Sequence, residues 1–288
     1  MGPVDVVNLA PLMNRTAGRP EIIIGLIDGP VLLHHPDLEN QHIRVASEKA
    51  GSACSRADSF ACTHGTFIAG ILRARRGSSA PAICPGCTLL VRPIFAETTG
   101  DVPSAAPEEL AAAVVESVDG GARVLNLSVA LARPSPQGER RLTQALDYAA
   151  GRRVITVAAA GNQGTVGGSA ITRHPGVIPV AACDLLGRPL SDSNLGSSIG
   201  RRGLSAPGQG IMSLGTGGKS QSFGGTSAAT PFVTGAVALL WSEFPGASAA
   251  EVRLAVTRCG GLQRNALAPP VLDAWAAYQA MKRFSRRR

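Results

Sequence analysis

Four polar residues have the types and the order needed for acid–base and nucleophilic chemistry. They are an aspartate, a histidine, an asparagine and a serine: Asp28, His64, Asn162 and Ser227. Hydrolysis of an amide near neutral pH needs a nucleophile, a base whose pKa lies near the working pH, a carboxylate that orients the base, and donors for the oxyanion. The four residues supply one of each, so the sequence predicts amide hydrolysis.

Each of these residues has a simpler interpretation when it is taken alone. Asp28 could close an Asx turn, and His64 could be a helix cap or a surface residue. Asn162 could belong to an ordinary turn, and Ser227 to a small-residue turn before a core helix. Catalysis is favoured only because all four follow or begin elements that one fold can bring together.

Ser227 has the most informative local sequence. Residues 224–231 read as a tight glycine turn that enters an apolar helix, since Gly224 and Gly225 allow close backbone approach and Pro231 is tolerated only near a helix start. A helix N-terminus offers unpaired N–H groups and the positive end of the helix dipole. Ser227 is therefore expected where an anion forming beside its oxygen would be stabilised.

The segments that must position these residues alternate between strand and helix. Apolar, β-branched runs predict strands at residues 21–27, 89–95, 124–129, 154–160, 177–182 and 204–206. Helical patterns follow at residues 63–72, 107–118, 139–150, 232–240, 249–259 and 271–284. This alternation predicts a three-layer α/β fold, a doubly wound, mostly parallel sheet with helices on both faces. His64 is expected at the start of its helix, and Pro93 hints at an irregular or edge strand.

Length and composition predict one domain. The 288 residues are 44% hydrophobic, with no composition break that would mark a linker. We expect a single domain over residues 21–288 and an N-terminal extension over residues 1–20. The extension lacks the pattern of a secretory signal, and no run of about 18 apolar residues would span a membrane. The sequence therefore predicts a cytoplasmic protein with no membrane partner.

The chain is basic, with a formal charge of +8 and a pI near 9.7. Its positive residues are scattered along the sequence, and only 4% of the residues are aromatic, so few side chains could stack on bases. We expect no nucleic-acid partner. The charge instead favours an acidic polypeptide partner.

Six cysteines in a chain of this length do not make a disulfide scaffold. Cys84 and Cys87 have the spacing of a redox pair or half a zinc site, and Cys54 and Cys62 precede them. No second pair or paired histidine completes four ligands, so a local disulfide or two free thiols is favoured over zinc. Cys183 lies in an apolar run and is expected to be a buried thiol.

The segments around the four polar residues resemble the sequence blocks of the subtilisin-like serine proteases. In order, these blocks are residues 24–29, 64–66, 158–162 and 225–231, and the likeness extends from about residue 21 to residue 259. The resemblance implies that Ser227 is the nucleophile, that His64 is the general base and then acid, and that Asp28 orients His64. It also implies that the side-chain amide of Asn162 and the backbone N–H of Ser227 bind the oxyanion.

The same resemblance implies how a peptide substrate binds. One segment matches the strand that pairs with the substrate backbone, and it comprises Ser128, Val129 and Ala130. Another matches a wall of the pocket for the residue before the cut, and it comprises Ala159, Ala160 and Gly161. No metal or cofactor is implied. The calcium loop that many secreted members carry after the catalytic histidine is missing, so calcium is possible elsewhere but not indicated.

Departures from the family pattern narrow the expected function. Gly29 and Pro30 follow Asp28 in place of the commoner Ser/Thr-Gly, and Phe67 replaces a second histidine. The chain is similar to the proteases that cut leader peptides from cyanobactin precursors in four features: the Asp-Gly-Pro-Val phrase at residues 28–31, Cys87 followed by a strand that ends at residues 92–95, the Ser-Ala-Ala-Thr-Pro ending at residues 227–231, and the absence of an inhibitory prodomain before Asp28. We expect a serine endopeptidase that cuts the leader from a ribosomally made precursor peptide. The alternatives are a broad-specificity intracellular subtilase and a non-catalytic peptide-binding pseudoprotease.

Overall fold

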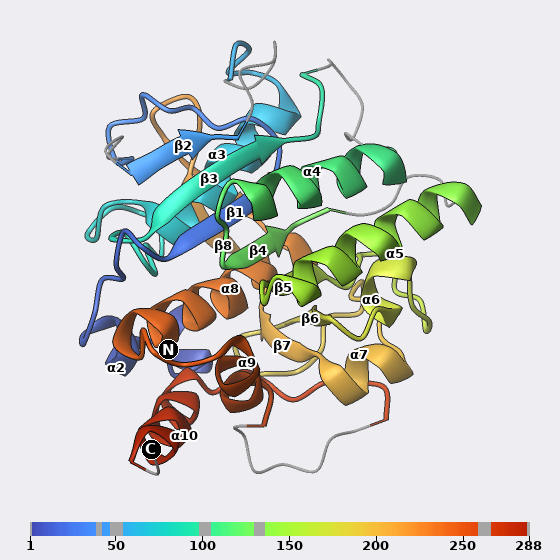
Figure 1. The fold of residues 1–288 in the computed structure, drawn as a ribbon. Helices are drawn as coiled ribbons and strands as arrows, with labels where there is room; N and C mark the ends of the chain where they lie inside the picture. The colour runs from blue at the N-terminus through green and yellow to red at the C-terminus, as the bar shows by residue number, and fades with distance from the viewer. Residues whose placement is uncertain are drawn as a thin grey trace.

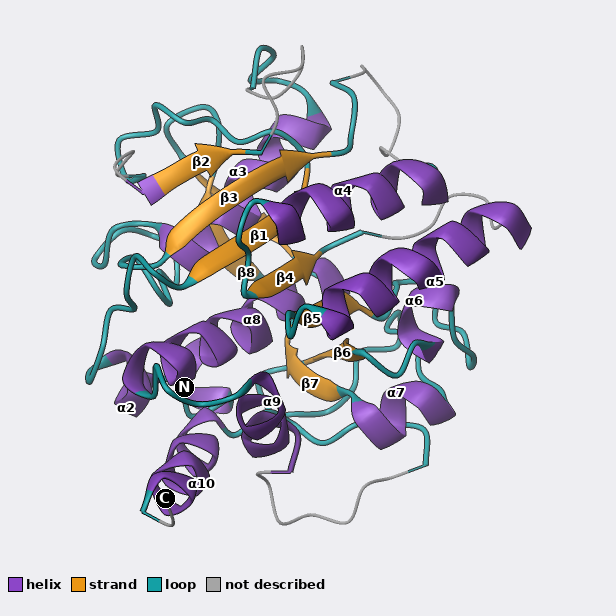
Figure 2. Cartoon of the chain, viewed as in Figure 1, coloured by secondary structure: helices purple, strands orange, loops and turns teal. Residues whose placement is uncertain are grey.

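Seven strands form one sheet in which every neighbouring pair is parallel. The computed structural model describes residues 2–38, 42–46, 54–97, 105–129, 136–258 and 266–286. The strand order is β2-β3-β1-β4-β5-β6-β7 (Figure 1; Figure 2). The strands are β1 (Ile23–Asp28), β2 (Ile43–Val45), β3 (Thr88–Pro93), β4 (Val124–Leu127), β5 (Ile155–Ala159), β6 (Val177–Cys183) and β7 (Leu204–Pro207). The predicted α/β sheet is confirmed.

A short antiparallel hairpin and ten helices complete the described elements. The hairpin consists of β8 (Ile211–Leu214) and β9 (Ser220–Phe223). The helices are α1 (Pro3–Val6), α2 (Ala10–Met13), α3 (Phe60–Arg73), α4 (Pro107–Asp119), α5 (Pro136–Gly151), α6 (Ala170–Arg173), α7 (Ser197–Arg202), α8 (Thr226–Glu243), α9 (Ala249–Arg258) and α10 (Ala274–Ser285). None of the helices in the described part of the chain is both long and apolar enough to cross a membrane.

Helices cover both faces of the sheet. α4 and α5 lie on the face toward the viewer in Figure 1, where Leu110 and Leu142 pack with Leu125 of β4. α3 and α8 lie on the opposite face, where Phe232 and Ile24 belong to a second, larger cluster of buried residues. Burial on both faces explains why the strands read as continuous apolar runs.

After β1, the chain first adds strands β2 and β3 on one side of β1 and then strands β4 to β7 on its other side. Leu26 of β1 pairs with Val91 of β3 on one side and with Asn126 of β4 on the other. The carboxyl ends of β1 and β4 therefore flank the point where the strand order reverses, which is where open α/β sheets bind ligands. Asp28 ends β1, and Ser128 directly follows β4.

The N-terminal segment packs against the C-terminal helix. Val7, Leu9 and Leu12 are completely buried in the larger core cluster. The backbone N–H of Ala274, at the start of α10, donates to the carbonyl oxygen of Val7 at 2.9 Å. Residues 2–20 thus contribute side chains to the same core as the sheet.

One local prediction was wrong, and it concerns where a helix begins. The helix expected at residues 63–72 begins earlier, at Phe60, because the Ser59 hydroxyl caps it by accepting the N–H of Cys62 at 3.1 Å. His64 therefore lies in the second turn and not at the helix start. Pro93 was expected at an irregular or edge position of its strand, and β2 pairs with Leu89–Val91 of β3 but does not reach Pro93. Pro93 is the last residue of β3. The backbone N–H of the next residue, Ile94, donates to the backbone carbonyl oxygen of Asp28 at 2.9 Å.

The cysteines separate into one disulfide and buried thiols. Cys54 and Cys62 are bonded, with Cα atoms 5.4 Å apart. Cys84 and Cys87 are free and buried. Of the two states expected for them, a local disulfide or two free thiols, the structure has the free thiols. Cys183 is the buried thiol that was predicted, and burial followed by the charge of Asp184 raises its pKa to about 12.

Candidate active site

Asp28 and His64 form a buried hydrogen-bonded pair. Nδ1 of His64 lies 2.7 Å from Oδ1 of Asp28, and the N–H of Gly29 donates to the same oxygen at 2.7 Å. The Asp28 side chain is fully buried, and only 12% of the His64 side chain is exposed. Within the described residues, Oδ2 of Asp28 has no hydrogen-bond partner. Gly29, which stands where the family commonly has Ser or Thr, has no hydroxyl that could donate to Oδ2 of Asp28.

Two glycines let β1 and α3 approach closely enough for this contact. A Cβ at Gly29 would lie 1.9 Å from the carbonyl oxygen of Ala61, and a Cβ at Gly65 would lie 2.4 Å from the carbonyl oxygen of Gly29. Neither position has room for a side chain. The backbone contact between the two glycines therefore places His64 over the end of β1.

The environment of His64 raises its pKa above the ordinary value of 6.5. Burial is the largest influence and by itself lowers the pKa, because it disfavours the charged ring. The negative charge of Asp28 and its hydrogen bond act in the opposite direction and together outweigh burial. The pair therefore favours a protonated imidazole at slightly acidic pH and supports a base that works above it.

Ser227 lies in the first turn of α8, as predicted. Gly225 precedes this helix with φ of +84°, a conformation that favours glycine. The Ser227 hydroxyl donates to the carbonyl oxygen of Ser128 at 3.3 Å. In the described part of the chain it makes no hydrogen bond to His64, so the hydroxyl faces the end of β4 in this conformation.

Asn162 follows β5 and is held by the same helix start. Its Oδ1 accepts the backbone N–H of Thr226 at 2.8 Å and the Thr226 hydroxyl at 2.9 Å. A Cβ at Gly225 would lie 2.8 Å from both the amide nitrogen and the amide oxygen of Asn162. Because the oxygen is occupied, the amide NH₂ is directed to other acceptors. Thr226, which sequence reasoning passed over, thus orients Asn162.

A buried polar network joins β4 to α8, and sequence reasoning missed its role. Asn126 donates from Nδ2 to the Ser128 hydroxyl at 2.8 Å, and its Oδ1 accepts the Thr234 hydroxyl at 2.8 Å. The Ser128 hydroxyl donates in turn to the carbonyl oxygen of Ser227 at 3.1 Å. A fully buried amide inside an apolar strand was the available signal. The network fixes the Ser227 turn relative to the sheet.

The profile of the subtilase family matches residues 19–265. The chain belongs to this family. Subtilases are serine endopeptidases, and their three-layer α/β fold is the one described above.

Curated relatives are subtilases of similar sequence over most of this chain. Fervidolysin of Fervidobacterium pennivorans is 29% identical over 275 residues, which cover 87% of this chain. Subtilisin DY of Bacillus licheniformis is 29% identical over 235 residues, which cover 80% of each chain. The chain spans only 39% of fervidolysin and 58% of subtilisin amylosacchariticus of Bacillus subtilis subsp. amylosacchariticus.

Solved structures similar to this subtilase include two maturation proteases. The patellamide maturation protease PatA is 30% identical with a TM-score of 0.76, and the match covers 92% of this chain and 98% of PatA. The prenylagaramide maturation protease PagA is 26% identical with a TM-score of 0.83, and the match covers 95% of this chain and 98% of PagA.

The segments expected to bind substrate in this subtilase lie beside the Ser227 turn. Ser128 and Val129 are buried after β4, while Ala130 falls outside the described residues. Ala159 ends β5, and Ala160 follows it. The N–H of Gly161 donates to the Thr226 hydroxyl at 3.1 Å. The two segments thus reach the start of α8 from neighbouring strands.

Aromatic rings surround His64, and the sequence did not reveal this grouping. Phe60 stacks on the imidazole with ring centroids 5.8 Å apart, and Phe223 of β9 lies 6.1 Å from it. Phe67 packs edge-on against Phe223 at 5.0 Å. Phe67 occupies the position of the family's second histidine, so it extends this apolar wall.

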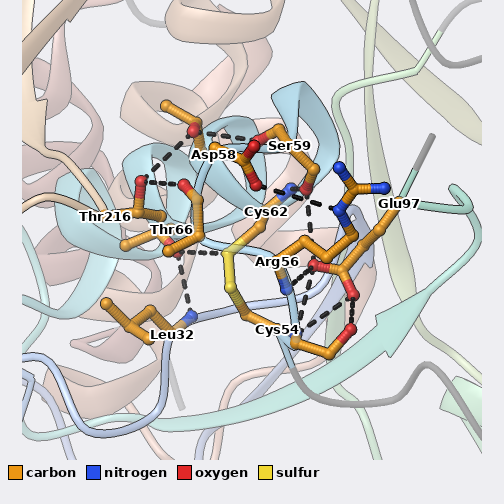
Figure 3. The surroundings of a disulfide bond; sticks show 12 residues. Leu32, Cys54, Arg56, Asp58, Ser59, Cys62, Thr66, Glu97 and Thr216 are labelled. Atoms are coloured by element: carbon orange, nitrogen blue, oxygen red, sulfur yellow. Dashed lines mark hydrogen bonds and ion pairs between the residues drawn. A yellow bond between two sulfur atoms is a disulfide. The ribbon is translucent and has the colours of Figure 1, made fainter. Parts of the chain in front are cut away.

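The disulfide supports the segment that leads into α3. Cys62 precedes His64 by two residues on α3, and Figure 3 shows Glu97 beside the disulfide. The Glu97 carboxylate accepts the N–H groups of Ser55 at 3.0 Å and of Arg56 at 2.9 Å. These bonds outweigh partial burial and lower the pKa of Glu97. The disulfide and Glu97 together hold the entry to the histidine helix.

Proposed function

We propose that this chain is a serine endopeptidase that cuts leader peptides from ribosomally made precursor peptides. The observation that carries the proposal is the buried Asp28–His64 pair at 2.7 Å, in a chain that also places a serine in the first turn of α8. The similarity to PatA and PagA, each named a maturation protease, supports the choice of substrate class.

In the proposed mechanism, Ser227 and His64 exchange the reacting proton. The Ser227 hydroxyl turns away from the Ser128 carbonyl and attacks the scissile carbonyl carbon, while Nε2 of His64 takes its proton. Asp28 holds Nδ1–H and stabilises the imidazolium that forms. His64 then protonates the leaving amine, and water releases the acyl group by the reverse exchange. The freed Ser128 carbonyl accepts a backbone N–H of the substrate.

We assign the oxyanion site to Asn162 and to the backbone of Ser227. The amide oxygen of Asn162 is held by Thr226, so its NH₂ group is available to donate. The first N–H groups of a helix lack intrahelical acceptors, which leaves that of Ser227 free to donate as well. Ala159, Ala160 and Gly161 are proposed as one wall of the adjoining specificity pocket.

Cleavage profiling tests this function. The chain and its Ser227→Ala variant are incubated with an unbiased peptide mixture at pH about 8, where a histidine base is neutral, and the products are analysed by mass spectrometry. Ser191→Ala, a change at an exposed serine, is the matched control. We expect a few cuts that share a motif, present with the control and absent with Ser227→Ala.

Other outcomes separate the alternatives. Cuts scattered over many sites would favour the alternative of a broad-specificity subtilase. A chain that neither cuts peptides nor reacts with a fluorophosphonate would be a peptide-binding pseudoprotease, which would contradict the proposal.

A further inference from the structure

Four arginines from α7 and α9 line one surface pocket of about 340 Å³. They are Arg201 and Arg202 at the end of α7, and Arg253 and Arg258 on α9. The two helices are far apart in the sequence and lie near the β7 side of the sheet (Figure 1). The fold therefore gathers positive charge that appears scattered in the sequence.

Backbone carbonyls hold two of these arginines inside the pocket. Arg202 donates from Nη2 to the carbonyl oxygens of Thr172 at 3.1 Å and Arg173 at 2.8 Å. Arg253 donates from Nη1 to the carbonyl oxygen of Gly176 at 2.9 Å. Carbonyl groups are neutral, so these bonds fix the guanidinium groups in place without cancelling their charge.

Three of the four arginines of the pocket have no carboxylate partner in the described part of the chain. Among the described residues, Arg202, Arg253 and Arg258 form no ion pair with a carboxylate, and Nε of Arg202 is buried without a hydrogen-bond partner. Burial and the neighbouring charge of Arg202 lower the pKa of Arg253. Guanidinium groups that are held close together, with neutral acceptors only, attract an anion to the pocket.

We propose that this arginine pocket is a second substrate-binding site, which captures acidic side chains in the leader segment of the peptide. The proposal rests on the proposed function for its substrate class. Guanidinium groups bind carboxylates by paired hydrogen bonds, and the carboxylates of Asp and Glu are the anions that a peptide carries. None of the described residues that line the pocket is aromatic, so they offer no stacking surface for nucleic-acid bases.

The pocket and the catalytic residues lie at opposite ends of the sheet. Arg253 contacts Gly176 and Val177 at the amino end of β6, whereas Asp28 ends β1 and Asn162 follows the carboxyl end of β5. α8 has 18 residues and leads from Ser227 toward α9, a length of about 27 Å at about 1.5 Å per residue. An extended peptide covers about 3.3 Å per residue, so the acidic residues should lie on the order of ten residues from the cut.

Binding of a fluorescein-labelled hexaglutamate peptide to the full chain tests the site without requiring cleavage. Arg201→Glu with Arg258→Glu reverses two exposed charges at the pocket. Arg140→Glu with Arg141→Glu reverses two exposed charges on α5 and is the matched control. Fluorescence anisotropy gives the affinity of each, and circular dichroism checks that both variants fold.

We expect the pocket variant to weaken hexaglutamate binding about tenfold or more, and the control to change it less than about threefold. Equal weakening by both variants would show a general attraction to a basic protein and overturn the proposal, as would no binding to the wild-type chain. Displacement of hexaglutamate by a lower concentration of oligouridylate would instead identify a nucleic-acid site. Fluorophosphonate labelling of Ser227 in the same samples reports the proposed catalytic function separately.

Discussion

Nδ1 of His64 lies 2.7 Å from Oδ1 of Asp28, although the two residues are 36 positions apart in the chain. The contact joins the end of the central strand β1 to the second turn of α3. The oxygen that receives it also accepts the N–H of Gly29, so the carboxylate is held in one orientation. The protonation state of His64 therefore depends directly on Asp28.

The first prediction concerns the pH dependence of cleavage. Burial lowers the pKa of His64, but the charge and hydrogen bond of Asp28 raise it further, so its net pKa lies above 6.5. A general base must be neutral, and kcat/KM should therefore rise with pH through an acid limb above pH 6.5. A pH profile of peptide cleavage without an acid limb would contradict the assignment of His64 as the base.

Asp28→Asn tests what the carboxylate contributes to the Asp28–His64 pair. The amide keeps the shape of the carboxylate but carries no charge and can stabilise the wrong imidazole tautomer, so kcat should fall by about 10⁴-fold. Thermal unfolding of the variant, followed by circular dichroism, controls for loss of structure. A loss of activity smaller than about tenfold in a folded variant would exclude Asp28 from the machinery.

Asn162→Ala should lower kcat and leave KM nearly unchanged. The amide donates to charge that develops only in the transition state, and loss of such a donor in subtilisin, the source of this magnitude, costs about 10²–10³ in kcat. Thr226→Val is the matched comparison, because it removes the hydroxyl that holds Asn162 but keeps the donor. We expect its loss of kcat to be smaller. If the two variants lost kcat equally, positioning by Thr226 would matter as much as the donor itself.

Gly65→Ala should separate α3 from β1. The added Cβ would lie 2.4 Å from the carbonyl oxygen of Gly29, so one backbone must shift and stability should fall by about 1–3 kcal/mol. Cleavage should fall as well, because the shift moves His64 from Asp28. Gly151→Ala has nothing within 4 Å of its Cβ and serves as the control for both urea unfolding and kinetics.

Reduction of the Cys54–Cys62 bond should destabilise the chain. The closed loop is short, with a sequence separation of 8, and removing such a cross-link costs roughly 2–3 kcal/mol. We expect a lower Tm in a phosphine reductant. Cys54→Ser should have the lower Tm from the outset and show no further change when reductant is added.

A thermal transition that reductant leaves unchanged would show that the bond contributes nothing to stability.

The cytoplasmic location expected from the sequence stays a prediction. The disulfide bears on it, because cytosolic thiols reduce such bonds. Trapping of free thiols in intact cells, followed by mass spectrometry of Cys54, measures its state where the protein resides.

Local sequence was sufficient for the elements that carry the candidate site. Continuous apolar runs predict strands buried on both faces, and the glycine turn before Ser227 predicts the start of α8, because these patterns depend on neighbours in the chain. The order of the four polar residues was enough to suggest one chemistry and one family. The start of α3 was misplaced because the cap at Ser59 lies beyond the apolar pattern that was used to find the helix.

Only the tertiary structure decided how distant residues meet. The buried role of Asn126, the aromatic rings of Phe60 and Phe223 around His64, and the pairing of Cys54 with Cys62 depend on contacts between separate elements. The arginine pocket is where the structure differs most from the sequence prediction. Charges that are scattered along the chain gather in a pocket lined by α7 and α9. A sequence lists its charges along one dimension, whereas electrostatic energy depends on their distances in three.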